Sequence, residues 1–330
     1  FPYEDRDINL KDAQLDKDGN IHLLASVALA GEDGKRRGIL ADWDLRIFTY
    51  YRDDESFKEH KVTIGRKEED TYLTQVQMFR DVKGRIHCSG FYSNNKQNSV
   101  KGLFTFDVDT ENKTITNIKH QDFTDEFINE FLNKRQQKKK QRAQDKGKNR
   151  YDELRNIVLR DFVLKSDGSF YFVAESYIYY VVTTTDANGV TRTTHHYIYG
   201  DVLLADVKAD NSVNWFARIP KYQHTTNDNG KYSGLSTSIG KNDELHVIFN
   251  DSKKNATVKY PEKLINFNLR NAITVLVSFD QKGDFSKTPL MPAKEASTIL
   301  MPKMHYAAKP GDLLLFATIR KDYRFINIRF

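Results

Sequence analysis

Short alternating runs of apolar and polar residues, each introduced by a tight polar turn, recur along the whole chain. Five segments share the order of a turn residue, a glycine or aspartate, one polar residue and then three or four strand formers. They are KDGNIHLLAS (17–26), VKGRIHCSGF (82–91), SDGSFYFVAE (166–175), KNDELHVIFN (241–250) and KPGDLLLFAT (309–318). This order is typical of a β-hairpin whose turn residue adopts a positive φ. The pattern therefore predicts a repeated hairpin.

Each of the first four hairpins is followed by a second strand pair, so each of these units is expected to hold four antiparallel strands. In LRIFTYYRDDESFKEHKVTI, for example, two apolar runs flank a charged turn. Four-stranded units in a regular array are typical of a β-propeller, in which each sheet buries its faces against its neighbours. We predict one all-β propeller domain over residues 1–330. Its units are approximately 10–70, 71–124, 157–220, 235–290 and 299–330.

The runs DGNIHLL and SDGSFYFVAE resemble the strand-turn-strand element of NHL-like β-propellers. This resemblance covers the first hairpin of each unit, and it implies the fold but no particular activity. The last unit, KMHYAAKPGDLLLFATIRKDYRFINIRF, has only three strands. Either residues 1–10 complete a five-bladed ring, or further blades precede Phe1. Pro2 and the acidic run that follows it make a poor strand, which favours further blades.

Connection length differs between the two sides of the expected propeller. The turns inside each hairpin lie on one side and are short throughout. The connections between hairpins and between blades lie on the other side, which we call the long-connection side. It holds the insertions 30–44, 120–156, 177–200 and 252–271. Insertions confined to one side of a repeat protein mark its binding surface. We therefore expect a partner to bind there.

One of these insertions, YIYYVVTTTDANGVTRTTHHYIYGD (177–201), predicts a long hairpin ribbon with Asn188-Gly189 as a two-residue turn. In that register Tyr180 lies opposite Tyr197, and both share a face with Ile178 and Tyr199. Cross-strand pairs of this kind stabilise a ribbon by about 0.2–1 kcal/mol each. Two interpretations stand: the tyrosines stabilise the ribbon only, or they form a stacking surface for a sugar, a peptide or a partner protein. The candidate binding residues are Tyr177, Tyr179, Tyr180, His195, His196, Tyr197 and Tyr199.

No residue pattern predicts a metal or a cofactor. His195 and His196 are neighbours on one strand, so they point to opposite faces and cannot share a metal. His224 could join one of them, although nothing in the spacing requires it. Cys88 is the only cysteine, which excludes an intrachain disulfide and a cysteine-based zinc site.

The segment 125–156 is expected to form a helical, lysine-rich insertion. Phe127 and Phe131 recur at helical spacing and should dock its first turns. Residues 134–150 hold nine Lys or Arg against one Asp, so this stretch carries a net charge of +8. The net charge of the whole chain is +6, so the rest of the chain carries −2. Two interpretations stand: a solvated loop, or an anionic surface bound through Lys138, Lys139, Lys140 and Arg142. No aromatic residue interrupts the lysines, so specific nucleic-acid binding is not expected.

Composition narrows the class of protein further. The 21 Phe and 17 Tyr suit strands better than helices. No apolar stretch reaches the roughly 20 residues that a membrane-spanning helix needs. The N-terminus FPYEDRDINL has neither an initiator methionine nor a signal-peptide pattern, so the chain is expected to be processed or truncated. This favours a secreted or cell-envelope protein.

The innermost strands offer little for catalysis. Their carboxylates are Asp12 and Asp161, and paired carboxylates in a propeller channel can act as acid and base. His22, His87 and His246 recur at one strand position of different blades, where we expect histidine simply to be tolerated. The main hypothesis is a noncatalytic binding or scaffold protein for a protein or glycan partner. The alternative is a propeller glycoside hydrolase or lyase acting on polysaccharide.

Overall fold

The computed structural model describes residues 7–28, 43–62, 71–94, 99–148, 152–260, 263–268, 270–292, 298–319 and 322–330. The insertion predicted over 30–44 lies almost entirely outside these ranges. The start of the suggested closing strand, residues 1–6, also lies outside them.

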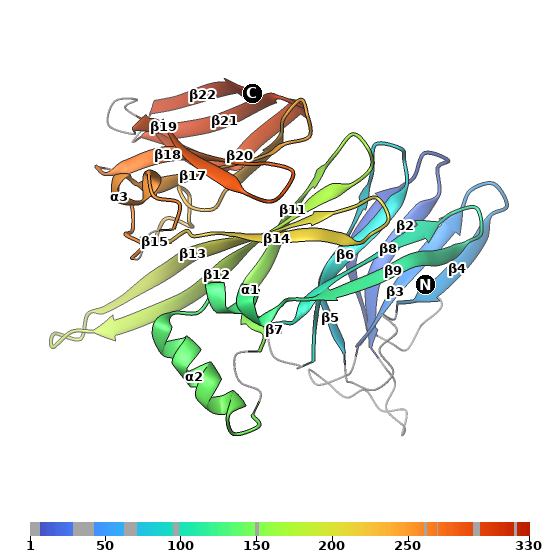
Figure 1. Cartoon of the computed structure of the whole chain (residues 1–330), viewed down its shortest axis with the longest axis horizontal. Helices are drawn as coiled ribbons and strands as arrows, with labels where there is room; N and C mark the ends of the chain where they lie inside the picture. Colours follow the sequence, from blue (N-terminus) through green and yellow to red (C-terminus); the bar gives the residue numbers. More distant parts are fainter. Residues whose placement is uncertain are drawn as a thin grey trace.

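Antiparallel sheets follow one another along the chain, as the repeat predicts (Figure 1). The first contains β1 (Ile8–Leu15), β2 (Ile21–Ala28), β3 (Trp43–Tyr51) and β4 (Ser56–Lys61). The second contains β5 (Tyr72–Arg80), β6 (Ile86–Ser93), β8 (Gly102–Asp109) and β9 (Thr114–Asp122). The third contains β11 (Ile157–Leu164), β12 (Phe170–Thr185), β13 (Thr191–Val207) and β14 (Val213–Ile219), with β15 (Gln223–Thr226) beside β13.

The remaining sheets complete the series. The fourth contains β16 (Ser236–Ile239), β17 (Leu245–Ser252), β18 (Ala272–Phe279) and β19 (Phe285–Pro292). The fifth has the three expected strands β20 (Ile299–Lys309), β21 (Asp312–Ile319) and β22 (Asp322–Arg329). The short elements are β7 (Ser99–Val100), β10 (Leu154–Arg155), α1 (Asp125–Glu130), α2 (Lys134–Gln144) and α3 (Lys253–Ala256). The all-β propeller prediction is confirmed, and so is the helical insertion.

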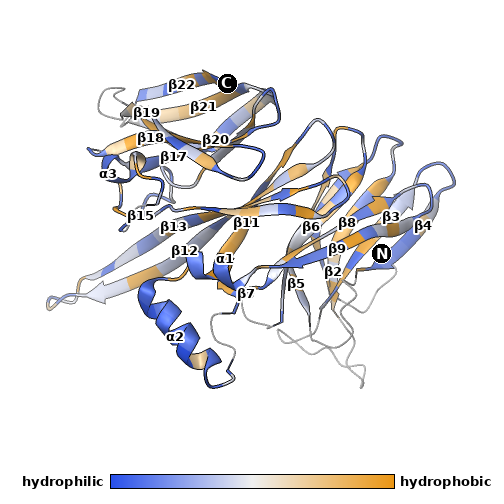
Figure 2. Cartoon of the chain, viewed as in Figure 1, coloured by the Kyte–Doolittle hydropathy of each residue, from blue (hydrophilic) through white to orange (hydrophobic). Residues whose placement is uncertain are grey.

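The hydrophobic core lies between neighbouring sheets. Phe91 of the second sheet and Phe172 of the third are fully buried, and their rings meet edge to face with centroids 5.0 Å apart. Ile248 of the fourth sheet and Leu313 of the fifth likewise belong to one buried apolar cluster. Figure 2 shows the apolar stripes along the strands and the contrasting polarity of α2. Each blade is therefore stabilised chiefly by its neighbours.

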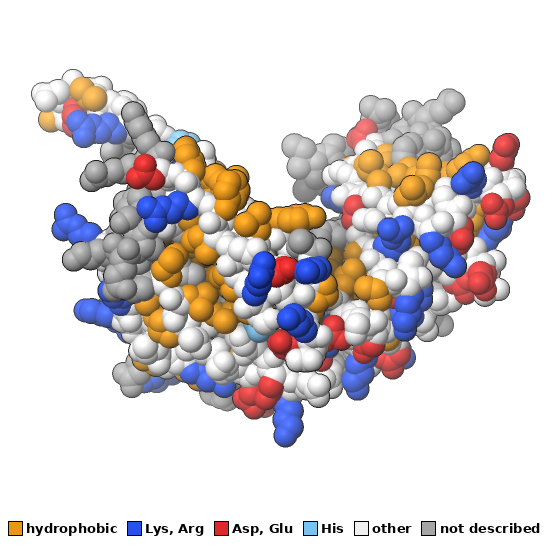
Figure 3. Space-filling view, turned by 90° about the horizontal axis from the view of Figure 1, so that it is seen from above, with side chains coloured by type: hydrophobic (Ala, Val, Ile, Leu, Met, Phe, Trp, Pro, Cys, Tyr) orange, Lys and Arg blue, Asp and Glu red, His pale blue; other side chains and the backbone are white. Residues whose placement is uncertain are grey.

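The sheets fan out along an arc, with the first and the fifth at opposite ends (Figure 1). Seen from above, the molecule is hollowed between its left and right arms, and apolar side chains lie along part of the hollow (Figure 3). Exposed apolar side chains of the end sheets include Leu15, Ile21 and Phe57 of the first sheet and Tyr306, Tyr323 and Phe325 of the fifth.

The predicted turn geometry is confirmed. Gly19, Gly84 and Gly168 have φ of +85°, +83° and +92°. In the fourth unit Asp243 takes the same place with φ +63°. A residue with a Cβ is strained in this region, which explains why four of the five turns use glycine.

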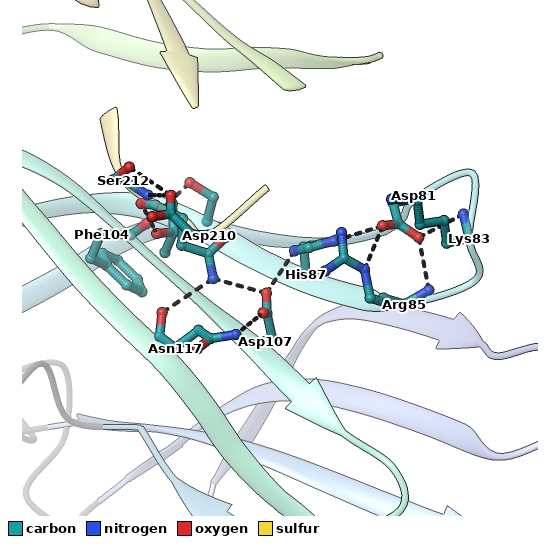
Figure 4. Close-up of polar contacts among 12 residues, drawn as sticks. Asp81, Lys83, Arg85, His87, Phe104, Asp107, Asn117, Asp210 and Ser212 are labelled. Carbon is teal, nitrogen blue, oxygen red and sulfur yellow. Dashed lines mark hydrogen bonds and ion pairs between the residues drawn. The ribbon is translucent and has the colours of Figure 1, made fainter. Parts of the chain in front are cut away.

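Histidine at the repeated strand position takes part in polar contacts in the blades that carry it, which the expectation of mere tolerance did not include. His22 lies 3.1 Å from the Asp16 carboxylate of its turn and 3.0 Å from the Thr49 hydroxyl of the next strand. The ring of His87 lies between Asp81 at 3.2 Å and Asp107 at 2.6 Å (Figure 4). In both blades the imidazole ties the hairpin turn to the third strand.

Polar side chains of the innermost strands tie successive blades together. Asp12 of β1 accepts a 2.8 Å hydrogen bond from the Met78 backbone of β5. Gln75 of β5 is bonded to the backbone of β11 at 2.6 and 2.7 Å. Asp161 of β11 accepts a hydrogen bond from Thr237 of β16. Both inner-strand carboxylates are therefore engaged in the joints between blades.

Candidate functional site

The long ribbon is a continuation of the third blade and not a separate insertion, because β12 and β13 simply extend beyond their sheet. Its register differs by one residue from the predicted one: Tyr180 pairs with His196, and Tyr179 pairs with Tyr197. Asp186 explains the error, since its carboxylate accepts hydrogen bonds from the backbones of Asn188 and Val190 at 2.9 and 3.0 Å.

Those bonds make the loop one residue longer than a two-residue turn. Gly189 alone adopts a positive φ, +80°, as in a three-residue hairpin loop. The shift also changes which side chains share a face, because successive residues of a strand point to opposite sides. Ile178 and Tyr180 therefore do not lie beside Tyr197 and Tyr199, contrary to the sequence-based expectation.

Four tyrosines now share one face of the ribbon, which we call the tyrosine face: Tyr177, Tyr179, Tyr197 and Tyr199. The rings of Tyr177 and Tyr199 have centroids 4.9 Å apart, and those of Tyr179 and Tyr197 are 5.2 Å apart. Tyr199 is buried at the base, whereas Tyr179 is 47% exposed farther out. The face thus runs from the body of the protein into solvent.

His195 lies on the tyrosine face, where its Nδ1 is 2.8 Å from the Tyr179 hydroxyl. His196 lies on the opposite face, where its ring stacks on Tyr180 with centroids 4.5 Å apart. The Nδ1 of His196 is 3.0 Å from the Nε2 of His224. The structure therefore separates the two adjacent histidines, as predicted. Within the described ranges, no group of three or more His, Cys, Asp or Glu side chains is placed to hold a metal ion.

Strand β15 and the loop after it support the ribbon. The backbone of β15 pairs with β13, and the Asn227 side chain accepts a 2.8 Å hydrogen bond from the His195 backbone. The Tyr197 hydroxyl donates a 2.9 Å hydrogen bond to Asn229. These contacts hold the tyrosine face in one orientation.

Two cations lie at the base of the tyrosine face, and we call them the cation pair: Arg160 from β11 and Lys303 from β20. The Arg160 guanidinium is 5.2 Å from the Tyr177 ring centroid. The Lys303 ammonium donates a 3.0 Å hydrogen bond to the Tyr199 hydroxyl and a 3.3 Å bond to the Asn229 carbonyl. Burial, together with the nearby charge of Arg160, lowers the pKa of Lys303.

A buried polar layer lies beneath the cation pair. Glu175 is fully buried and forms ion pairs with Arg160 at 2.9 Å and with Lys221 at 2.6 Å. Lys221 also donates to Gln223 at 3.0 Å. Burial lowers the pKa of Lys221, and the Glu175 carboxylate opposes that shift. This layer fixes the position of Arg160 under the tyrosine rings.

Helix α2 presents a second cationic surface. It begins with a capping box between Asn133 and Gln136. Its outer side, which we call the cationic helix face, is formed by Lys134, Arg135, Lys138, Lys139 and Arg142. Lys140 was predicted to join this surface, but it is buried and paired with Asp125 at 2.7 Å. The helical period explains the correction, because Lys140 falls on the side turned toward α1.

Sequence reasoning missed Arg160, Lys303, Glu175 and Asn229. Glu175 carried a signal, since a carboxylate at the end of the apolar run FYFVAE implies a buried partner. Arg160 and Lys303 carried none, because only the packing of the third blade near the fifth brings them to the same tyrosine.

The arrangement of sheets defines the chain as a β-propeller. No protein-family model matches the chain, and no curated protein does. None of the described helices is both long and apolar enough to cross a membrane.

Several solved structures are similar to this chain over most of their own length. A protein of unknown function from Dyadobacter fermentans is 10% identical with a TM-score of 0.38, covering 100% of this chain and 80% of that one. A mutant levansucrase from B. megaterium is 11% identical with a TM-score of 0.30, covering 98% and 83%. An exo-beta-1,3-galactanase from Clostridium thermocellum is 8% identical with a TM-score of 0.27, covering 100% and 84%. Similarity at this level gives no basis for assigning an activity to this chain.

Proposed function

We propose that this chain is a noncatalytic binding protein that holds a glycan on the tyrosine face of its long-connection side. The observation that carries the proposal is the line of four tyrosines on one side of a ribbon that projects from the propeller. Aromatic rings stack on the apolar faces of sugar rings, while hydroxyl and amide groups bond to sugar hydroxyls. Tyr197 and Asn229 supply such polar groups beside the rings.

Preorganisation supports a binding role. The ribbon is held by β15, by the Tyr197–Asn229 hydrogen bond and by the Lys303–Tyr199 hydrogen bond. A surface that is already ordered loses little conformational entropy when a ligand binds, so more of the contact energy appears as affinity. A ribbon needed only for the core would instead bury its outer tyrosines, whereas Tyr179 and Tyr180 are 47% and 40% exposed.

The hydrolase or lyase alternative receives less support from the inner strands. Asp12 accepts hydrogen bonds from the Met78 and Ala13 backbones, both at 2.8 Å. Asp161 accepts hydrogen bonds from the Thr237 hydroxyl and, at 2.9 Å, from the Phe162 backbone. Burial raises the pKa of Asp161, and the bond from Thr237 opposes that shift. We therefore assign both carboxylates to positioning the blades and not to acid–base chemistry.

A glycan-binding measurement with paired variants tests the proposal. The double variant Tyr179→Ser/Tyr197→Ser should bind the glycan that the wild type binds most tightly about fivefold to a hundredfold more weakly, since each of the two aromatic contacts is worth about 0.5–1.5 kcal/mol. Tyr180→Ser is the matched control, because Tyr180 lies on the opposite face of the same ribbon. Titration calorimetry against neutral and acidic polysaccharides measures both.

Equal losses in the tyrosine-face variant and the control would contradict the proposal. So would glycan cleavage by the wild type that stops in Asp161→Asn, which would support the hydrolase or lyase alternative.

A further inference from the structure

We infer that the ligand of the tyrosine face is an anionic glycan, whose carboxylate or sulfate group binds at the cation pair Arg160 and Lys303. This inference rests on the proposed function and adds the chemical class of the ligand. It follows from the charge balance at the base of the ribbon and from the hydrogen-bonding capacity left on Lys303.

The cations at this place outnumber the anions. Arg160, Lys221 and Lys303 lie around the Tyr199 ring, with their charged groups 5.6, 5.8 and 5.0 Å from its centroid. Glu175 is shared by Arg160 and Lys221 and is fully buried beneath them. In the described part of the chain, Lys303 forms no ion pair with a carboxylate within 4.0 Å. Asp228 also acts on Lys303 through space but forms no ion pair with it among the described residues, so the Lys303 ammonium faces the ligand side without a bound counter-charge.

Lys303 also has hydrogen-bonding capacity to spare. An ammonium group has three N–H donors. Two are directed to the Tyr199 hydroxyl at 3.0 Å and the Asn229 carbonyl at 3.3 Å. The third remains for a ligand. Both neutral acceptors belong to the tyrosine face or its supporting loop, so a group bound to Lys303 lies beside the rings.

Arg160 adds a second positive charge at the base of the tyrosine face. Its Nε donates to Glu175 at 2.9 Å, but its Nη2 is buried and has no hydrogen-bond partner among the described residues. Glu175 is also needed by Lys221, so it neutralises Arg160 only in part. A positive charge fixed under an aromatic surface in a partly desolvated place attracts an anion more strongly than the same charge in water.

The geometry points to a sugar polymer that carries its charge on the ring it stacks. The rings of Tyr179 and Tyr197 offer the stacking surface, and the cation pair lies at the inner end of the same face. A uronic acid or a sulfated sugar presents an apolar ring face and an anionic substituent together. A neutral sugar would leave the cation pair unused.

The test compares polygalacturonate with its fully methyl-esterified form, which has the same backbone without the charge. Dextran sulfate and dextran form a second pair that distinguishes sulfate from carboxylate. We expect the wild type to bind one anionic member at least about tenfold more tightly than its neutral partner, and the difference to shrink as salt screens the charges. Lys303→Met should remove about tenfold or more of that preference, and Lys303→Arg should restore part of it.

Two control variants keep the assignment specific. Lys309→Met removes the same charge from the same strand, where Lys309 forms an exposed 3.4 Å pair with Asp312. It should leave the preference unchanged. A second variant, Lys138→Gln/Lys139→Gln/Arg142→Gln, neutralises part of the cationic helix face and should leave the Lys303-dependent preference in place.

The outcomes separate the inference from the function on which it rests. Equal binding of charged and neutral members, still lost in Tyr179→Ser/Tyr197→Ser, would overturn the anionic class but keep glycan binding. No binding to any glycan would overturn both. A preference lost in the helix variant but kept in Lys303→Met would place the anion site on α2 and overturn the inference.

Discussion

Charged groups are treated differently on the two sides of the propeller. On the side of the short turns, His87 is paired with both Asp81 and Asp107, and Arg85 donates to Asp81 at 2.8 Å (Figure 4). On the long-connection side, Lys303 and the cationic helix face lack carboxylate partners within the described ranges. The first side pairs these charged groups with one another, whereas the second leaves the charge of Lys303 and of the cationic helix face available to a ligand.

On the proposed function, this difference separates the residues that stabilise the fold from those that bind the ligand. A buried charged group is costly unless it is paired, so the short-turn networks belong to the folding energy of each blade. An uncompensated charge contributes little to folding and is retained at a cost that ligand binding can offset. Substitutions on the two sides should therefore fail in different ways.

The largest effect is expected from His87→Leu. Removing the imidazole leaves the buried carboxylates of Asp81 and Asp107 without the group that lies between them. We expect a loss of about 3 kcal/mol or more in the free energy of unfolding, as for other broken buried pairs. Urea unfolding followed by circular dichroism measures it. A loss below that of Tyr180→Ser would show that the network is not part of the blade's stability.

The next largest effect is expected at the turn glycines. A substitution there should cost more stability on the short-turn side than at the tip of the ribbon. Gly19→Val forces a β-branched residue to φ +85°, with its Cβ 3.0 Å from the Arg52 side chain, and should cost about 1–2 kcal/mol. Gly189→Val at the ribbon tip meets the same backbone strain but no neighbour within 4 Å. The tip can open locally, so its global cost should be smaller. Equal losses in thermal unfolding would contradict this contrast.

Acidification should weaken the short-turn side first. Burial lowers the pKa of His22 in the folded protein, although Asp16 opposes the shift. The unfolded chain therefore binds more protons, and stability decreases as the pH falls below about 6.5. Burial raises the pKa of Asp81, but hydrogen bonds from Arg85 and His87 outweigh it and lower the net value below 3.8. Its contribution is lost at still lower pH.

The size of the histidine contribution is about 1.4 kcal/mol for each pKa unit between the folded and unfolded states. Urea unfolding of the wild type and His22→Gln between pH 7.5 and 5 isolates it. The wild type should lose more stability than the variant over this range. A parallel dependence in the two proteins would show that His22 does not contribute.

The smallest effect on stability is expected on α2. Replacing Lys134, Lys138, Lys139 and Arg142 by glutamine removes exposed or half-buried charges that form no ion pair among the described residues, so the unfolding midpoint should hardly change. Retention on heparin in low salt should nevertheless fall, if this face contacts anionic surfaces. Lys140→Gln is the contrasting variant, because it breaks the pair with Asp125 and should lower stability. Unchanged retention would leave the helix face as a solubilising surface.

Much of the fold could be predicted because its signals are local. A turn with positive φ followed by alternating apolar residues specifies a hairpin wherever it occurs, and five such turns in order predict five blades. The cationic insertion could be placed for the same reason. The role of the repeated histidine could not be predicted, because Thr49, the partner of His22, and Asp107, the partner of His87, both lie on the next strand.

The register of the ribbon could not be predicted from the local sequence pattern. The existence of the ribbon and its tyrosines followed from the sequence, but its register depended on how the Asp186 carboxylate bonds to the turn, and a shift of one residue exchanges the faces. Only the tertiary structure brings Arg160 of the third blade and Lys303 of the fifth to one tyrosine, because nothing local encodes how the third, fourth and fifth blades pack together. Alternation and turn chemistry thus determined the blades, whereas the packing of blade on blade decided which side chains meet at the site.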